Sequence, residues 1–214
     1  AKASDRVLCL EPALPGGALK MQRKGRCVVR LDVSGVAAHG GNPAKGVSAI
    51  DELMTALRKI QMLRSADISV NVGLIGGGEK ANVVAEAAFA VCDIRFWTND
   101  QKARILRFVK ALGSGSRRAK IRVTVEGTTP PMEKTRISET LFREAQAVAS
   151  EMGVRLSAGK SSGGSDGSIA AGAGRAVLDG LGPDGDGIHA AHEHLLLPSL
   201  IERTALLTAF LQKL

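Results

Sequence analysis

The stretch GRCVVRLDVS, residues 25–34, alternates apolar and polar side chains along most of its length. Four apolar residues would share one face: Cys27, Val29, Leu31 and Val33. Arg30 and Asp32 fall between them and would point to the opposite face. Because successive side chains of a strand point to opposite faces, this pattern predicts a strand with one buried and one solvated face.

The segments that follow extend this strand into a recognisable unit. Apolar residues at helical spacing predict amphipathic helices, the second with Asn99 or Asp100 as N-cap, and alternating patterns predict further strands. The expected helices are 46–63 and 99–112, and the expected strands are 67–75, 86–96 and 121–125. The order β-α-β-β-α-β over residues 25–127 indicates a ferredoxin-like sandwich with an antiparallel sheet. Such a sheet has an open edge that can pair with another chain.

The remaining segments alternate between helix and strand, which predicts a parallel α/β layer. They are strands at 6–10, 154–157 and 175–179, and helices at 137–152, 166–172 and 198–213. Because there are only three such strands, they look like part of a larger sheet. We therefore expect an α/β fold in which a lid domain, 17–131, is inserted between a segment at 1–16 and a C-terminal part at 132–214.

Composition narrows the class of protein. The chain has 214 residues, of which 44% are hydrophobic, and contains no apolar run long enough to span a membrane. The first residues do not resemble a signal peptide, although a preceding segment could hold one. The three cysteines are scattered through strand-like stretches, which favours reduced thiols in a cytoplasmic protein.

The net charge and the aromatic content indicate which classes of binding partner are compatible with the chain. The formal net charge is +8, whereas aromatic residues make up only 3% of the chain. Proteins that bind single-stranded nucleic acid stack bases on aromatic side chains, so nucleic-acid binding is disfavoured. A solvated basic surface and a specific anionic small-molecule substrate both remain compatible with this charge.

Residues that could bind a ligand or take part in catalysis occur at four places in the sequence. Glu11 closes an apolar strand, where open α/β sheets bind ligands, although taken alone a surface acid at a strand end is the favoured interpretation. His39 lies in a glycine-rich loop, and Arg95 lies on a strand as either a solvated charge or a carboxylate clamp. The backbone of Gly163–Ser165 precedes a short helix that Asp166 could cap, and its N–H groups could bind a carboxylate.

The stretch GDGIHAAHEH, residues 185–194, holds three of the four histidines. His189, His192 and His194 are three and two positions apart, which differs from the four-residue spacing of helical zinc motifs. A local three-histidine site would need an unusual backbone. A loop that supplies one ligand to a site completed from elsewhere is the favoured interpretation.

Taken in order, five stretches resemble the zinc-dependent aminoacylase/carboxypeptidase family, and within it the folate-hydrolysing glutamate carboxypeptidases. They are CLEPALPGGAL, VSGVAAHGGNPAKGVSAI, SVNVGLIGGG with NVVAEAAFAVCDIRF, SSGGSDGS and LDGLGPDGDGIHAAHE. The resemblance implies an α/β catalytic domain with two zinc ions and an inserted lid that forms a homodimer through its sheet edge. It also implies a small-molecule or peptide substrate with a free carboxylate.

The resemblance assigns roles to particular positions. Glu11 resembles the carboxylate ligand of one zinc ion, and His189 resembles the histidine ligand of the other. His39 resembles the lid histidine that stabilises the oxyanion in the partner's active site. Asn82 resembles the lid asparagine that holds the substrate carboxylate there, and Arg95 resembles the arginine that clamps it. The remaining assigned residues, whose backbone would line the same pocket, are Gly163, Gly164 and Ser165.

Some positions depart from the family pattern. Ala85 replaces a common proline, Ser162 a common glycine, and Ala190-Ala191 a common Ser-Pro. Glu193 matches a recurrent family acid that is not usually a ligand, and the other two histidines of its loop are not family ligands. The family's other zinc ligands and its catalytic glutamate would precede residue 1.

These observations predict a zinc metallopeptidase chain that recognises substrate and stabilises the oxyanion. It would release a C-terminal amino acid, such as glutamate, by amide hydrolysis. As a truncated chain with two metal ligands, it is expected to be inactive alone. The alternative is a non-catalytic dimerisation or binding module derived from the family. Neither a nucleic-acid partner nor a membrane is expected.

Overall fold

The computed structural model describes residues 3–113 and 118–214, and its contacts divide the chain into two compact units. The first unit comprises Ala1–Lys24 and Pro130–Leu214, and the second comprises Gly25–Thr129. The first boundary therefore lies later than the expected residue 17. The reason is strand β2 (Leu19–Arg23), which pairs with strands of the first unit rather than with the sheet of the second.

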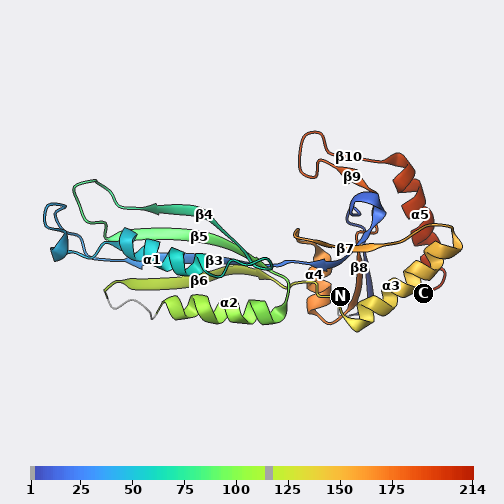
Figure 1. The fold of residues 1–214 in the computed structure, drawn as a ribbon, viewed down its shortest axis with the longest axis horizontal. Helices are drawn as coiled ribbons and strands as arrows, with labels where there is room; N and C mark the ends of the chain where they lie inside the picture. Colours follow the sequence, from blue (N-terminus) through green and yellow to red (C-terminus); the bar gives the residue numbers. More distant parts are fainter. Residues whose placement is uncertain (1–2, 114–117) are drawn as a thin grey trace. The chain divides into compact units, whose positions relative to one another are not determined.

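The second unit is a four-stranded antiparallel sheet with two helices (Figure 1). Its elements in chain order are β3 (Gly25–Ser34), α1 (Ala49–Gln61), β4 (Ser69–Gly77), β5 (Ala87–Phe96), α2 (Asn99–Leu112) and β6 (Lys120–Thr129), with a short 3-10 turn, η2 (Pro43–Lys45), before α1. The strand order in the sheet is β4-β5-β3-β6. This confirms the expected β-α-β-β-α-β sandwich, and it leaves β4 and β6 as the edge strands.

The alternating pattern places one face of this sheet in a core shared with both helices. The inward residues of β3 are Cys27, Val29, Leu31 and Val33, all at most 2% exposed. Helix α1 begins after Ser48, whose side chain accepts a hydrogen bond from Asp51 N–H. Helix α2 begins after Thr98, which forms a capping box with Gln101. Thr98, rather than Asn99 or Asp100, is thus the N-cap.

The first unit has a mixed sheet in the order β1-β8-β2-β7. Its strands are β1 (Arg6–Cys9), β2, β7 (Ala158–Ser161) and β8 (Ala176–Asp179). Strands β1 and β8 are parallel, as are β2 and β7, whereas β2 meets β8 antiparallel through a single bridge. The fully parallel layer expected from the sequence is therefore wrong. The strand expected at 154–157 lies instead at β7.

Helices and a small two-stranded sheet complete the first unit. They are α3 (Arg136–Glu151), α4 (Asp166–Gly172), α5 (Leu197–Leu211), the 3-10 turn η1 (Pro15–Gly17), and strands β9 (Gly185–Asp186) and β10 (His194–Leu195). One apolar cluster packs α3 and α5 against Leu178, and a second packs α4 against Val177. Because neighbouring strand residues face opposite ways, Val177 and Asp179 both face the α4 side of the sheet.

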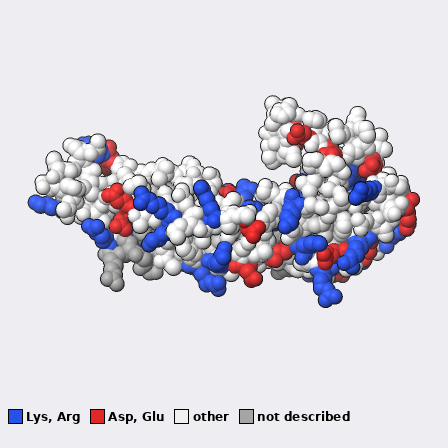
Figure 2. Space-filling model, viewed as in Figure 1, with Lys and Arg blue, Asp and Glu red and all other residues white. Residues whose placement is uncertain are grey.

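Figure 2 shows lysine and arginine side chains spread over both units and interspersed with acidic ones. Among the residues that the structure describes, no helix combines the length and apolar character needed to cross a membrane.

Candidate functional site

A buried ion pair lies at the carboxyl ends of β1 and β8. Arg23 on β2 binds Asp179 in a bidentate manner, with Nε to Oδ2 at 2.8 Å and Nη2 to Oδ1 at 2.7 Å. The side chain of Arg23 is 2% exposed and that of Asp179 is fully buried. Because a buried charge is costly unless it is paired and hydrogen-bonded, the two residues depend on each other.

The same arginine organises the glycine loop between β7 and α4. Its Nη1 donates to the carbonyl oxygens of Gly163 and Gly164, both at 3.2 Å. Ser165 donates from Oγ to Asp179 and accepts from Gly167 N–H at 2.9 Å. Ser165, rather than Asp166, is therefore the N-cap of α4. The loop is held by its carbonyl oxygens and its serine.

Glu11 lies beside this network. Its carboxylate is 48% exposed and approaches Arg23 Nη2 to 4.0 Å. Cys9 packs on the same side, and a Cβ atom at Gly167 would lie 2.7 Å from Asp179 Oδ2 and 3.0 Å from Cys9 Sγ. Burial and the Asp179 carboxylate raise the pKa of the Cys9 thiol to about 11. Cys9 is thus a neutral thiol at neutral pH.

The sequence analysis missed Arg23 and Asp179. Asp179 closes the apolar run AVLD in the same way that Glu11 follows VLCL, so the signal was present. Arg23 gave no such signal because LKMQR does not alternate cleanly and its strand has an irregular register between Lys20 and Gln22. Only the pairing of β2 with β8 shows that these charges are buried together.

Hydrogen bonds join the segment that carries Glu11 to the segment that leads to His189. Gly182 N–H donates to Glu11 O at 2.9 Å, and Ala13 N–H donates to Pro183 O at 3.0 Å. The Asp184 carboxylate accepts from the backbone of Gly16 at 2.8 Å and of Gly185 at 2.9 Å. These hydrogen bonds hold the two segments side by side.

His189 has a backbone φ of 66°, and it is the one residue other than glycine with positive φ in the described part of the chain. Left-handed backbone at a non-glycine residue is uncommon and clusters at functional sites. Its N–H donates to Glu193 Oε2 at 3.0 Å. Glu193 therefore stabilises the loop conformation that presents His189.

The other two histidines of this loop are exposed, and His194 Nδ1 lies 3.0 Å from His192 O. Within residues 3–113 and 118–214, no group of three or more His, Cys, Asp or Glu side chains is placed to hold a metal ion. Glu11 and His189 offer a carboxylate and an imidazole, which zinc accepts, but a catalytic site needs about three protein ligands. The described residues alone therefore do not form a zinc site.

The second unit brings His39 and Asn82 together. Gly40 N–H donates to Asn82 O at 2.8 Å, and His39 forms an isolated bridge with Val83. Both residues are exposed. Gly41 N–H donates to His39 Nδ1 at 3.0 Å, so a neutral imidazole carries its proton on Nε2. The outward nitrogen is then a donor.

Arg95 lies elsewhere on the same unit. It is paired with Arg26 and Ser69, near the far end of β5 from Asn82. Asp93 accepts from Arg95 Nε at 3.1 Å and from Arg26 Nε at 2.6 Å. Burial raises the pKa of Asp93, but these hydrogen bonds outweigh it, so the pKa lies below its ordinary value. Asp93 thus fixes Arg95 on the open face of the sheet.

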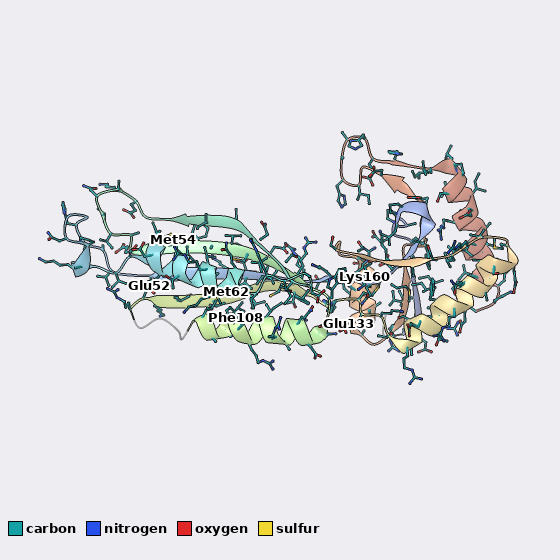
Figure 3. All side chains as sticks on the ribbon, viewed as in Figure 1. Glu52, Met54, Met62, Phe108, Glu133 and Lys160 are labelled. Atoms are coloured by element: carbon teal, nitrogen blue, oxygen red, sulfur yellow. The ribbon has the colours of Figure 1, made fainter. Side chains whose placement is uncertain are left out.

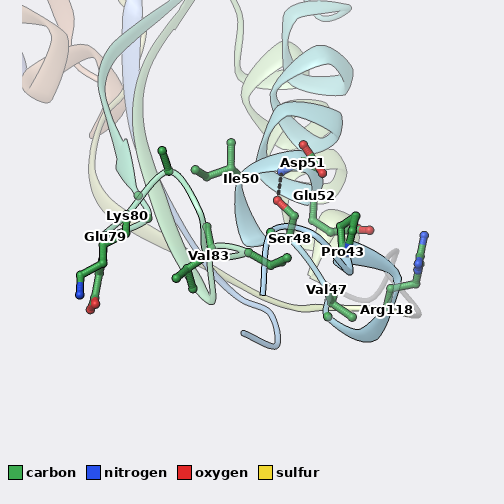
Figure 4. A pocket seen from close by; sticks show the side chains of 17 residues that line it. Pro43, Val47, Ser48, Ile50, Asp51, Glu52, Glu79, Lys80, Val83 and Arg118 are labelled. Atoms are coloured by element: carbon green, nitrogen blue, oxygen red, sulfur yellow. Dashed lines mark hydrogen bonds between the residues drawn. The ribbon is translucent and has the colours of Figure 1, made fainter. Parts of the chain in front are cut away.

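A hollow of about 670 Å³ lies beside the loops that carry His39 and Asn82 (Figure 4). It is bordered by Gly40, Val83 and the start of α1, where Ser48 binds Asp51 N–H. None of the candidate residues lines it. The candidate residues instead fall in four places: Glu11 with the Gly163–Ser165 loop, the His189 loop, the His39–Asn82 pair, and Arg95.

Comparison with known proteins gives matches to both units. Residues 21–113 match a family model described as a peptidase dimerisation domain. Over 98% of its length the chain is 25% identical to carboxypeptidase G2 of Pseudomonas sp. (strain RS-16), of which it covers 52%. A probable carboxypeptidase of Arthroderma otae is 33% identical over 39% of the chain and 22% of its own length.

Solved structures share the fold. A tripeptidase from Staphylococcus aureus superposes with a TM-score of 0.80 at 22% identity, covering 98% of this chain and 57% of its own. Aminopeptidase PepT from Bacillus cereus gives the same values. The chain thus spans about half the length of the relatives that it matches from end to end.

Proposed function

From the premise that this chain is a homologue of carboxypeptidase G2 with a peptidase dimerisation domain at residues 21–113, we propose that it is the substrate-recognition and dimerisation part of a zinc-dependent hydrolase. The matches confirm the resemblance to this peptidase family. The proposed reaction is hydrolysis of an amide bond that releases a C-terminal amino acid such as glutamate. Because the chain spans about half of its relatives, "complete hydrolase" here means a protein that joins this chain to the further zinc ligands and base.

The observation that carries the proposal is the separation of the recognition residues on the sheet. Arg95 lies eight positions after Ala87 on β5, which corresponds to about 26 Å at roughly 3.3 Å per residue. His39 and Asn82 lie beyond the Ala87 end. One substrate carboxylate cannot contact Arg95 and Asn82 of the same chain, so a shared site requires two chains.

Antiparallel pairing of β4 with β4 of a second copy would supply that arrangement. Ser69, at the start of β4, pairs with Arg95, whereas Gly77, at its end, pairs with Ala88 next to the Asn82 loop. A two-fold axis through the strand edge brings the start of one β4 level with the end of the other. Arg95 and the partner's Asn82 then lie at the same end of the joined sheet.

The side chains favour β4 over β6 as the pairing edge. Leu74 is 60% exposed and Ile75 is 61% exposed on β4. Met54 on α1, which packs beside β4, and Met62 immediately after this helix are also exposed (Figure 3). The outward residues of β6 are polar or charged instead: Lys120, Arg122, Thr124 and Glu126. Burial of the apolar β4 and α1 surface supplies the driving force for a homodimer.

The geometry supports distinct roles for the recognition residues. His39 Nε2–H would donate to the oxyanion that forms during amide hydrolysis, because Nδ1 already accepts from Gly41. Asn82 and Arg95 would bind the substrate carboxylate from opposite chains. Glu11 and His189 would each contribute to zinc binding in the complete hydrolase. We also propose a cytoplasmic location, which the three free cysteines support.

The test is release of glutamate from N-acylglutamate substrates by the complete hydrolase, with and without zinc. His39→Ala is expected to lower kcat by roughly 10²–10³, the usual loss for one oxyanion donor. Arg95→Ala is expected to act mainly on KM, because the carboxylate is present in both ground and transition states. Failure to release any amino acid from N-acyl or peptidyl substrates would favour the alternative, a non-catalytic binding module.

A further inference from the structure

The excess positive charge of this chain lies on helix α2, strand β6 and the segment between them. From residue 101 to residue 125 the sequence holds eight lysine and arginine residues and no aspartate or glutamate. The formal net charge of the whole chain is +8, so the charges of the remaining residues cancel. On α2, Arg104, Arg107 and Lys110 are exposed at intervals of three residues, which places them on one side of the helix.

Strand β6, which follows α2, is an edge strand with an open outer side. As far as the structure describes the chain, β6 pairs with β3 alone. The end of α2 lies beside the beginning of this strand, where a Cβ atom at Gly113 would lie 3.2 Å from Ile121 O. Further along, Arg122, Thr124 and residues 126–128 are exposed. Because the outer side of an edge strand presents unpaired N–H and C=O groups, this stretch can accept a further strand.

On the side of β6 that faces the helices, the apolar row is only partly covered. Ile121 is buried in the core shared with both helices, whereas Val123 and Val125 are half-buried at its margin. Side chains of adjacent strands lie next to each other on the same face of a sheet. Apolar side chains of an added strand would therefore cover Val123 and Val125 and remove them from water.

The opposite side of β6 is positively charged. Lys120 and Arg122 alternate with the inward residues and therefore face the side of the sheet without helices. Together with Asp32 and Ser34 they border a hollow of about 260 Å³. Asp32 already accepts a hydrogen bond from Arg30 Nε at 2.9 Å. Neither Lys120 nor Arg122 forms an ion pair with a residue that the structure describes, so both cations are available to an anionic side chain.

We propose that the outer edge of β6 binds an extended acidic segment of another protein, which joins the sheet as an added strand. The backbone of the segment pairs with β6, its carboxylates face Lys120 and Arg122, and its alternate apolar side chains cover Val123 and Val125. The exposed cations of α2 attract the same segment at longer range. Glu126 ends the basic stretch, so no carboxylate is expected opposite it.

Charged residues on an edge strand also prevent pairing between identical chains. A second copy of this chain would bring its own cations against Lys120 and Arg122, and like charges on neighbouring strands are destabilising. An acidic segment meets no such barrier. Protection of the edge alone predicts that no strand binds, whereas the proposal predicts that an acidic one does.

The test uses the 214-residue chain and two synthetic peptides of about eight residues, within the usual length range of a strand. The first peptide alternates glutamate with valine. The second contains the same residues with all glutamates before all valines, so it has the same charge without the alternation. NMR titration at low salt should show tighter binding of the alternating peptide. Amide hydrogen exchange within residues 122–125 should slow in its presence, because outward N–H groups become paired.

Matched double variants examine the basic side of β6. Lys120→Gln/Arg122→Gln removes two exposed charges and should weaken binding of the alternating peptide roughly 5- to 20-fold, through lost cross-strand pairs and lost long-range attraction. Arg58→Gln/Lys59→Gln removes two exposed charges from α1 and should change the binding little. The exchange measurement on the wild-type chain needs no variant, so it applies even where a variant fails to fold.

Four results would overturn the proposal: no binding of the alternating peptide, equal binding of both peptides, slower exchange at β4 instead of β6, or equal weakening by the two double variants. Binding of a DNA duplex or of anionic lipid vesicles that depends on Lys120 and Arg122, without a preference for the alternating peptide, would assign the surface to another polyanion and also overturn it. Hydrolysis and zinc play no part in these measurements, so their outcome is independent of the proposed function.

Discussion

His39 and Arg95 lie at opposite ends of one four-stranded sheet. His39 follows the Ser34 end of β3, whereas Arg95 pairs with Arg26 at the beginning of that strand. Both are candidate contacts of one substrate. Their separation means that the site is built from two chains or that one of the two assignments is wrong.

The Arg23–Asp179 pair should be the most sensitive polar contact of the first unit. Asp179→Leu leaves the Arg23 guanidinium buried without its partner, so we expect a loss of about 3–5 kcal/mol in the free energy of unfolding. Urea unfolding measures it. Arg6→Met removes half of an exposed pair with Glu144 and should cost about 0–1 kcal/mol.

The double variant Arg23→Met/Asp179→Leu checks the cause of that loss. Removal of both charges leaves no orphaned ion, so the double variant should be more stable than Asp179→Leu alone. A double variant as unstable as the sum of both single changes would show that packing, rather than charge pairing, accounts for the loss.

Asp93 gives a pH-dependent prediction. Its pKa is lowered in the folded chain, so its contribution to stability is present above the unfolded pKa, near 3.9, and is lost as the pH falls through the folded pKa. Asp93→Asn should therefore cost about 0.5–1 kcal/mol at pH 7, discounted because Arg26 is half-exposed. The difference between the two proteins should shrink as the pH falls below about 3.9, and a difference that stays constant would contradict the ion-pair explanation.

The proposed dimer edge can be tested by charge insertion. Ile75→Lys places an ammonium in the apolar β4 surface that the dimer would bury, so the dissociation constant of the dimer should rise roughly tenfold or more. Analytical ultracentrifugation measures the association. Thr124→Lys makes a matched change on β6 and should leave association unaltered. The reverse result would assign the pairing edge to β6.

The 214-residue chain alone should release no amino acid at a useful rate, because its described residues do not form a zinc site and hold no group of three metal-binding side chains. An assay with N-acyl amino acids and added zinc, on a sample of verified mass, tests this expectation. Robust hydrolysis that is abolished by a chelator would contradict it.

The second unit was predictable because local patterns agree with its tertiary structure. The alternation of Val29 and Leu31 with polar neighbours fixes both the strand and its buried face, and no distant residue alters that assignment. The cap of α2 was misplaced by one residue because Thr98, Asn99 and Asp100 are all good caps. Only the capping box with Gln101 distinguishes them.

The candidate site was less predictable because it depends on contacts between residues far apart in sequence. Glu11 and the Gly163–Ser165 loop were identified from motifs, but the residue that joins them was not. Arg23 gives no local signal, since a charge in a short strand usually faces water. Its burial follows from the pairing of β2 with β8, which sequence periodicity does not reveal.

The claim that two chains share one site is tested most directly by mixing two variants of the complete hydrolase with lowered kcat/KM, His39→Ala and Arg95→Ala. Each homodimer lacks one recognition residue at both sites. In a heterodimer, the Arg95 of the first variant meets the His39 of the second, so one of the two sites is whole. Random mixing should restore about a quarter of the wild-type kcat/KM per chain, measured at substrate concentrations below KM, because half of the dimers are mixed and each has one working site. No recovery in a sample shown to contain heterodimers would contradict the shared site and show that one of the two assignments is wrong.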